Sequence, residues 1–390
     1  MHTALRMQIL LEGFEMNFFS RAKIVRFVNT ILLLAIALAP GAYAGQVQSD
    51  AGSYQQHNLV SDGFVPADNT DPNLVNAWGI SFNPFGPVWV ADNGAGAATL
   101  YDGAGRPQPQ PTPLVVQIPP PANSSGKGTP TGMVSNITPG FVVSQGGASG
   151  PARFLFATED GVIAGWSADV DATHAIRVID YSMKTGAVYK GLTLSAGGNG
   201  SLLYAADFHN NRIDVFDSSF KPVTLAAGAF TDPQLPAGFA PFNVQEINGD
   251  IYVAYAKQDA EKHDDVAGAG LGFINVFDPN GRLLRRVVSG DKLNAPWGIA
   301  LAPAGFGKFG NRLLVGNFGD GAIHAFDLQS GEFAGTLQGP NGNPIQIPGL
   351  WGLRFGNGFL NQPVNTLFFT AGPGEEAHGL YGRIDAVAGY

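Results

Sequence analysis

The chain has 390 residues, of which 22 are basic and 31 acidic, and its formal net charge is −9. This acidic balance argues against nonspecific binding to nucleic acid, which needs clustered lysine and arginine to displace counterions. Cysteine is absent, which excludes disulfides, thiolate nucleophiles and cysteine-ligated metals, and the 53 glycines and 27 prolines suit many short strands better than long helices.

Residues 1–44 are predicted to be a signal peptide, and Met16 is the expected true start. Three basic residues between positions 21 and 26 precede a short apolar core at 31–39, and small residues at 42–44 offer a cleavage site. The apolar core is too short to span comfortably a hydrocarbon layer of about 30 Å. An uncleaved anchor is the alternative. We therefore expect an exported protein, periplasmic or extracellular, with no stable membrane insertion after cleavage.

Residues 45–390 are predicted to form a single domain, because one hairpin pattern recurs six times along them. In the copy "LLYAADFHNNRIDVFD", a first strand ends in a small residue and an aromatic residue closes the second. The small residues of the six copies are Ala91, Ala157, Ala205, Ala254, Gly316 and Thr370. The aromatic residues are Tyr101, Trp166, Phe216, Phe277, Phe326 and Tyr381. A further strand precedes each hairpin, beginning at Ala77, Pro130, Lys190, Pro241, Pro296 and Leu350.

The repeat length of about 56 residues is typical of the blades of a β-propeller. We therefore predict an all-β fold, a six-bladed β-propeller. The last copy lacks an outer strand, and we expect the segment "HNLV" at 57–60 to complete it and close the ring. Two stretches interrupt the repeat. Residues 105–131 are proline-rich and are expected to connect the first two blades, whereas the charged stretch 256–270 is either a solvated loop or a lid or docking loop over one face.

Two of these stretches resemble the NHL repeat. "LYAADFHNNRIDVFD" is close to its pattern of a strand followed by N-x-R-I-x-V-F-D, and "PWGIALAP" at 296–303 is similar to its opening. The chain from about 55 to 387 resembles an uncharacterised family of exported bacterial NHL-like proteins, on stretches such as "WVADNGAG" and "PTGMVSN". This resemblance implies an NHL/TolB-like six-bladed propeller and implies no activity.

Four residues are candidates for ligand binding near the channel mouth. They are Trp78, Trp297, Trp351 and Asn243. In a repeat protein, tryptophans at matching positions are first of all packing residues, so both roles stay open. The glycine after each tryptophan is expected to let neighbouring backbones approach closely near the axis.

Four oxygen-bearing residues follow the small residue of their hairpins and are candidate metal ligands. They are Asp92, Glu159, Asp207 and Asn317. If they point inward, they could converge on Ca²⁺, as the resemblance to propellers of the gluconolactonase and regucalcin type would imply. The alternative is that such side chains satisfy the backbone of their own turns.

Two functions follow from these features. The first is an exported, noncatalytic binding or scaffold protein that presents one face to a peptide, glycan or protein and needs no cofactor. The alternative is a Ca²⁺-dependent hydrolase or lactonase with its site at the channel mouth. Because no G-x-S-x-G, H-E-x-x-H or phosphate-loop motif occurs, the first is favoured. An amidating lyase is a distant third, since no histidine set for its zinc is visible.

Overall fold

The computed structural model describes residues 52–197 and 200–387, and the predicted signal peptide lies outside them. Within these residues the fold is almost entirely β-strand, with one short 3₁₀ helix at Gly307–Phe309. None of the described helices has the length and apolar character needed to cross a membrane.

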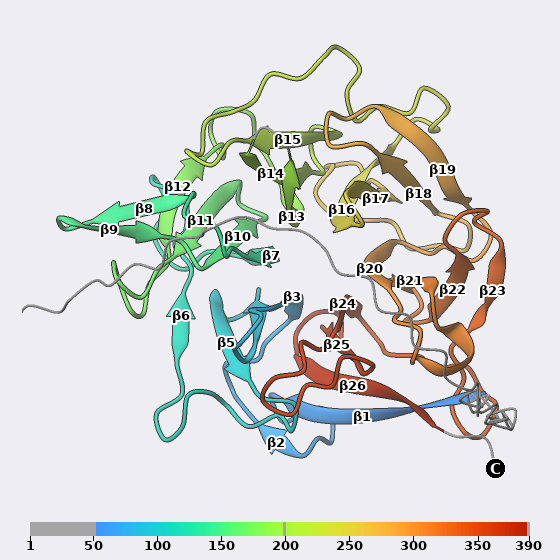
Figure 1. Cartoon of the computed structure of the whole chain (residues 1–390). Coiled ribbons are helices and arrows are strands. Elements are labelled where there is room, and N and C mark those ends of the chain that lie inside the picture. The colour runs from blue at the N-terminus through green and yellow to red at the C-terminus, as the bar shows by residue number, and fades with distance from the viewer. Residues whose placement is uncertain (1–51, 198–199, 388–390) are drawn as a thin grey trace, which may run out of the picture. The chain divides into compact units, whose positions relative to one another are not determined.

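Six antiparallel sheets form the six blades of a propeller (Figure 1). Blade 1 contains β3 (Ala77–Phe82), β4 (Val88–Asp92), β5 (Ala97–Tyr101) and β6 (Val115–Gln117). Blade 2 contains β7 (Pro130–Ser135), β10 (Phe154–Thr158), β11 (Val162–Trp166) and β12 (Ile176–Asp180). Blade 3 contains β13 (Tyr189–Gly197), β14 (Gly200–Asp207) and β15 (Arg212–Phe216).

The remaining strands complete the ring. Blade 4 contains β16 (Phe239–Ile247), β17 (Asp250–Lys257), β18 (Gly272–Phe277) and β19 (Leu283–Ser289). Blade 5 contains β20 (Pro296–Leu301), β21 (Arg312–Asn317), β22 (Ile323–Asp327) and β23 (Phe333–Thr336). Blade 6 contains β24 (Leu350–Phe355), β25 (Leu367–Ala371), β26 (Leu380–Val387), β1 (Ser53–Ser61) and β2 (Asn69–Thr70). A separate hairpin of β8 (Val142–Gln145) and β9 (Ala148–Pro151) projects from blade 2.

The predicted six-bladed architecture is therefore confirmed, and so is its closure. The innermost strands β3, β7, β13, β16, β20 and β24 contact one another in a complete cycle. The N-terminal β1 pairs antiparallel with the C-terminal β26, with His57 opposite Arg383 and Val60 opposite Tyr381. The Tyr54 hydroxyl extends this closure to blade 5, because it donates to the Phe306 carbonyl at 3.1 Å.

The proline-rich stretch 105–131 contributes one strand as well as a connection. Residues 115–117 form β6, the outermost strand of blade 1, and Ala97 of β5 lies opposite Gln117.

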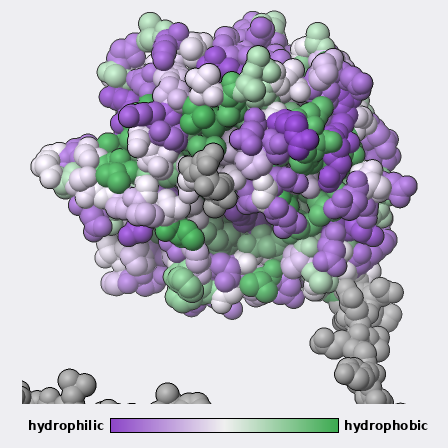
Figure 2. Space-filling model, turned by 45° about the horizontal axis from the view of Figure 1, so that its top comes forward, coloured by the Kyte–Doolittle hydropathy of each residue, from purple (hydrophilic) through white to green (hydrophobic). Residues whose placement is uncertain are grey.

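The blades bury their apolar faces against one another: Tyr204 of blade 3, for example, packs with Val253 and Phe277 of blade 4. On the face seen in Figure 2, hydrophilic and hydrophobic residues are interspersed. Each sheet is therefore stabilised chiefly by its two neighbours.

The inner strands approach one another so closely that, at one equivalent position in each strand, little room is left for a side chain. A Cβ atom added to Gly298 would lie 2.7 Å from the Trp351 carbonyl oxygen, and one added to Gly352 would lie 2.8 Å from the carbonyl oxygen of Trp78. Both contacts are with backbone, which cannot move without shifting a whole strand. The close approach predicted for the glycine after each tryptophan is confirmed.

We predict that Gly298→Ala lowers the free energy of unfolding by about 1–3 kcal/mol, because the added methyl group overpacks the contact between β20 and β24. Gly305→Ala in the same blade is the control, since its Cβ would lie 3.7 Å from its nearest neighbour, Asn365 Cβ. Equilibrium unfolding in urea measures both. Equal effects of the two substitutions would contradict this account of the ring.

Candidate functional site

An aromatic floor lies at the start of the inner strands. Trp78 of β3 stacks on Trp351 of β24 with ring centroids 3.7 Å apart, and Trp297 of β20 meets both rings edge-on. Phe318 stacks on the other side of Trp351 at 4.0 Å. All three tryptophans are at most 4% exposed, so the structure shows their packing role. Their role in ligand binding stays a prediction.

Two indole N–H groups of this floor have no hydrogen-bond partner among the described residues. They are Nε1 of Trp78 and Nε1 of Trp297, and both atoms are buried. The third indole is paired, because Trp351 Nε1 donates to Asn76 Oδ1 at 3.2 Å. Burial of an unpaired donor costs about 1–3 kcal/mol. Both groups are therefore donors that a bound molecule or a water can use.

The position that holds these tryptophans is occupied by a lysine in blade 3. Side chains at this position precede the glycine contact of the inner strands, and in ring order they are Trp78, Thr131, Lys190, Phe242, Trp297 and Trp351. The Lys190 ammonium lies 5.0 Å from the centre of the Trp78 ring, within cation–π range. Sequence reasoning missed Lys190 as a functional residue, although aligning the six inner strands would have shown a charged residue among the aromatic ones.

Two carboxylates, one from each of the two blades that flank blade 3, hold Lys190. Its Nζ donates to Glu159 Oε1, from the end of β10, and to Asp264 Oδ1 at 3.1 Å, from the loop between β17 and β18. The lysine side chain is only 1% exposed. Burial opposes its charge, but Glu159 and Asp264 outweigh burial and raise the pKa of Lys190. The two carboxylates therefore favour the charged form of Lys190 at this site.

Two further carboxylates lie at the same end of the channel without a cationic partner. Within the described part of the chain, Asp265 and Glu376 form no ion pair. Burial raises the pKa of Asp265 to about 7, against the opposing charge of Lys190 and with a smaller contribution from the carboxylate of Glu376. Burial also raises the pKa of Glu376, even though its Oε2 accepts a hydrogen bond from Asn76 at 2.8 Å. We call Glu159, Lys190, Asp264, Asp265 and Glu376 the acidic mouth.

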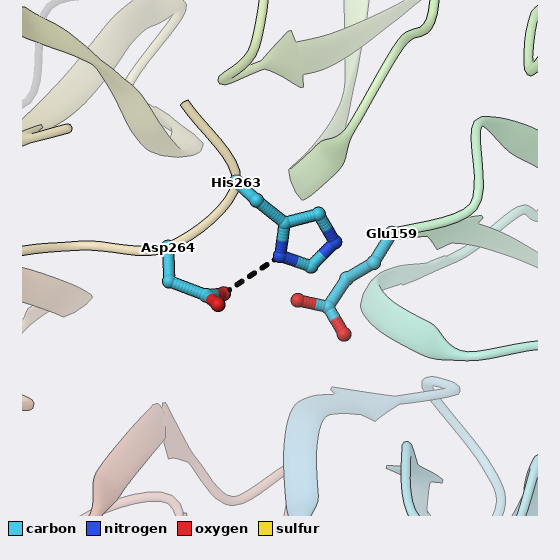
Figure 3. A group of neighbouring side chains, drawn as sticks. All are labelled: Glu159, His263 and Asp264. Carbon is cyan, nitrogen blue, oxygen red and sulfur yellow. Dashed lines mark hydrogen bonds and ion pairs between the residues drawn. The ribbon is translucent and has the colours of Figure 1, made fainter. Parts of the chain in front are cut away.

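The charged loop 256–270 lies against this mouth. Asp264 is 64% exposed but contacts the buried ammonium of Lys190, and Gln258 Nε2 donates to the Phe208 carbonyl at 2.6 Å. Figure 3 shows His263 and Asp264 of this loop facing Glu159 from another blade. The loop is thus in part solvated, as predicted, and in part a cover over the mouth.

Glu159, His263 and Asp264 form the one group of three acidic or histidine residues, among those described, whose donor atoms could bind a metal ion. These atoms lie within 4.8 Å of one another. A metal ion there would compete with two bound positive groups. Lys190 already contacts both carboxylates, and the hydrogen bond that His263 Nδ1 donates to Asp264 Oδ1 raises the pKa of His263 and so favours its protonated form.

Of the predicted metal ligands, Glu159 alone lies in this group. The Asp92, Asp207 and Asn317 side chains have partners within their own hairpins: Thr99 Oγ1 donates to Asp92 at 2.8 Å, Asn210 Nδ2 donates to Asp207 at 2.8 Å, and Asn317 Nδ2 donates to Asp320 Oδ2 at 3.3 Å. These three residues occupy the last position of their strands, where Thr158 stands in blade 2. Glu159 comes one residue later and so points in a different direction.

The predicted ligand residue Asn243 is part of the ring contact. It stands where the other inner strands have glycine, and its Nδ2 donates to the Trp297 carbonyl at 2.7 Å. Beneath the aromatic floor, Asn243 and Trp297 also line an axial cavity of about 20 Å³. A volume of this size holds about one water molecule. The axis is therefore filled, and a ligand at the mouth would not enter it.

We predict that Asp265→Asn raises the melting temperature by about 2–5 °C at pH 8. The folded pKa of Asp265, about 7, lies above its ordinary value of 3.8, so the folded state keeps a proton that the unfolded chain has released. The free energy of unfolding therefore falls as the pH rises from about 4 to about 7, and the amide removes this loss. Melting curves of the two proteins at several pH values measure this change in melting temperature. Glu261→Gln in the same loop is the control, and a gain equally large at pH 4 would contradict the prediction.

Known proteins are related in sequence to this chain over most of its length. No protein-family model matches. Uncharacterized protein R648 of Acanthamoeba polyphaga mimivirus is 34% identical over 333 residues, which cover 84% of this chain and 78% of the relative. Uncharacterized protein L690 of the same virus is 32% identical over 340 residues, which cover 85% of this chain and 86% of the relative.

Solved structures share the fold at low sequence identity. A Bacteroides thetaiotaomicron protein of unknown function matches with a TM-score of 0.50 and 10% identity, over 85% of this chain and 76% of that one. A streptogramin B lyase has a TM-score of 0.49 and 14% identity, over 86% and 97%. The aldose sugar dehydrogenase from Streptomyces coelicolor, in its PQQ-bound form, has a TM-score of 0.47 and 13% identity, over 85% and 98%.

At such identities, likeness to a solved structure concerns the fold alone, whereas the identity to R648 and L690 extends over more than four fifths of the chain. The chain belongs to the same family as the mimivirus proteins R648 and L690, and its fold is a six-bladed β-propeller.

Proposed function

We propose that this propeller is a noncatalytic binding protein and that its acidic mouth takes a cationic group of a peptide, glycan or protein partner. The observation that carries the proposal is the charge of the mouth. Four carboxylates gather around one lysine, and Lys190 pairs only with Glu159 and Asp264. Asp265 and Glu376 form no direct ion pair with it, and the carboxylate of Glu376 repels that of Asp265. An ammonium or guanidinium group bound between them would relieve that repulsion.

The mouth already stabilises one such group. The Lys190 ammonium is bound by carboxylates above an aromatic ring, which is the combination that proteins use for organic cations. By contrast, Lys190 is held in its charged form, so the buried amine of the mouth is unsuited to nucleophilic catalysis.

We predict that agmatine, a small molecule with one ammonium and one guanidinium group, raises the melting temperature of the protein by mass action. Glu376→Gln should reduce the shift, because it removes one of the two unpaired carboxylates while keeping an acceptor for Asn76. Glu261→Gln, an exposed position in the charged loop 256–270, should leave the shift unchanged. The absence of any shift up to about a hundredfold excess of agmatine over protein would reject the proposal.

A metal-dependent hydrolase or lactonase is the second candidate, because Glu159, His263 and Asp264 lie close enough to share an ion. The same melting experiment separates the two. A shift produced by Ca²⁺ and reversed by EDTA, together with copurified metal in elemental analysis, would favour the hydrolase. A shift with agmatine that EDTA leaves unchanged would favour the binding protein.

Export remains part of the proposal, on the strength of the basic, apolar and small-residue segments within 1–44. When the chain is expressed in a bacterial host, we predict that mass spectrometry of the protein from the periplasm or medium finds a chain beginning at Gly45. A cytoplasmic protein that retains residues 16–44 would show that this segment is not a cleaved signal.

A further inference from the structure

A second cavity lies at the end of the channel opposite the acidic mouth. It has a volume of about 290 Å³ and is lined by the closing residues of three inner strands, β16, β20 and β24, whereas the mouth lies at their first residues. Gln245 and Ile299 line both this cavity and the axial cavity above it. We call it the lower cavity. It is separate from the acidic mouth, since the aromatic floor and the axial cavity lie between them.

Arg354 supplies the lower cavity with a positive charge. Its side chain reaches from blade 6 to blade 4, where Nη1 donates to Gln245 Oε1 at 2.7 Å. No carboxylate of the described residues lies within 4.0 Å of its guanidinium. A guanidinium has five N–H donors, and the single hydrogen bond to Gln245 leaves four of them available. Burial lowers the pKa of Arg354, but an arginine stays charged under any condition in which the protein is folded.

One carboxylate acts on Arg354 from a distance. Glu246 lines the same cavity and partly offsets the effect of burial on the arginine. Its Oε1 accepts a hydrogen bond from the backbone N–H of Gly249 at 2.6 Å, which holds it in the turn between β16 and β17. It therefore weakens the positive field in the cavity without pairing with the guanidinium.

The remaining walls of the lower cavity are mixed, with the polar Asn248 beside several apolar side chains. Ile247, Ile299, Leu301 and Phe355 line it beside Arg354. An apolar wall with one guanidinium fits a ligand that has an apolar body and one planar anionic group, because a carboxylate accepts two parallel N–H bonds from an arginine fork. A phosphate fits less well, because its second charge would meet Glu246 and has no second cation to pair with.

We propose that the lower cavity binds a small monocarboxylic acid, with its carboxylate on the Arg354 guanidinium and its apolar part against Ile299 and Phe355. This site is independent of the function proposed for the acidic mouth, and either proposal can fail without the other.

Isothermal titration of the full chain with benzoate and with hexanoate tests this site, and inorganic phosphate is the comparison anion. We expect one molecule of benzoate or of hexanoate to bind per chain. Arg354→Gln should weaken binding by about tenfold or more, because it removes both the charge and the fork. Glu246→Gln should tighten binding a few-fold, because it removes the repelling charge but keeps an acceptor for Gly249. Glu261→Gln, in the charged loop 256–270, should leave the binding of both carboxylates unchanged.

Melting curves without ligand show whether each variant is folded. If Arg354→Gln is unfolded, Arg354→Lys takes its place, and this variant should still weaken binding because a lysine lacks the fork. Three results would overturn the proposal. They are the absence of benzoate and hexanoate binding by the unmodified chain, equal binding by a folded Arg354 variant, and binding of phosphate without binding of either carboxylate.

Discussion

The contact between neighbouring inner strands is the constraint on which the rest of this molecule depends. Gly298 and Gly352 bring backbone against backbone around the axis, and Asn243 replaces one glycine by donating a hydrogen bond across the same contact. Because the strands approach so closely, little space remains along the axis, and the cavity there holds about one water. Any chemistry of the ring is thereby moved to its two ends.

The same constraint explains how the acidic mouth is assembled. The residue before each close contact must project from the start of its strand, so six side chains from six blades gather at one end of the axis. Four are aromatic and one is Lys190. A buried ammonium requires anionic partners, and Glu159 and Asp264 provide them from a turn and from an inserted loop. The repeat thus supplies the floor, and segments that depart from the repeat supply the charges.

This division also decides what the sequence could predict. Blade number, inner-strand starts and closure by residues 57–60 follow from recurring patterns, and each is present in the structure. Strand-end residues such as Asp207 were expected to face either the channel or their own turn, and the hydrogen bond from Asn210 shows that Asp207 serves the turn. Pairing of Lys190 with Asp264 depends on the path of a loop that breaks the repeat, which no periodic pattern specifies. Arg354 and Gln245 lie 109 residues apart, and their contact requires the whole ring.

The pairing of β1 with β26 has a consequence for how the ring is made. The N-terminal strand of blade 6, Ser53–Ser61, leaves the ribosome before any blade exists, and its partner, Leu380–Val387, leaves after the strands of the other five blades. Blade 6 is therefore completed after every other blade has been synthesised, and the ring stays open until then. The loss of only eight residues around β26 would leave both β1 and β25 with an unpaired edge, and such edges pair readily with other chains. Synthesis through β26 is thus a condition of ring closure and of protecting these two strand edges.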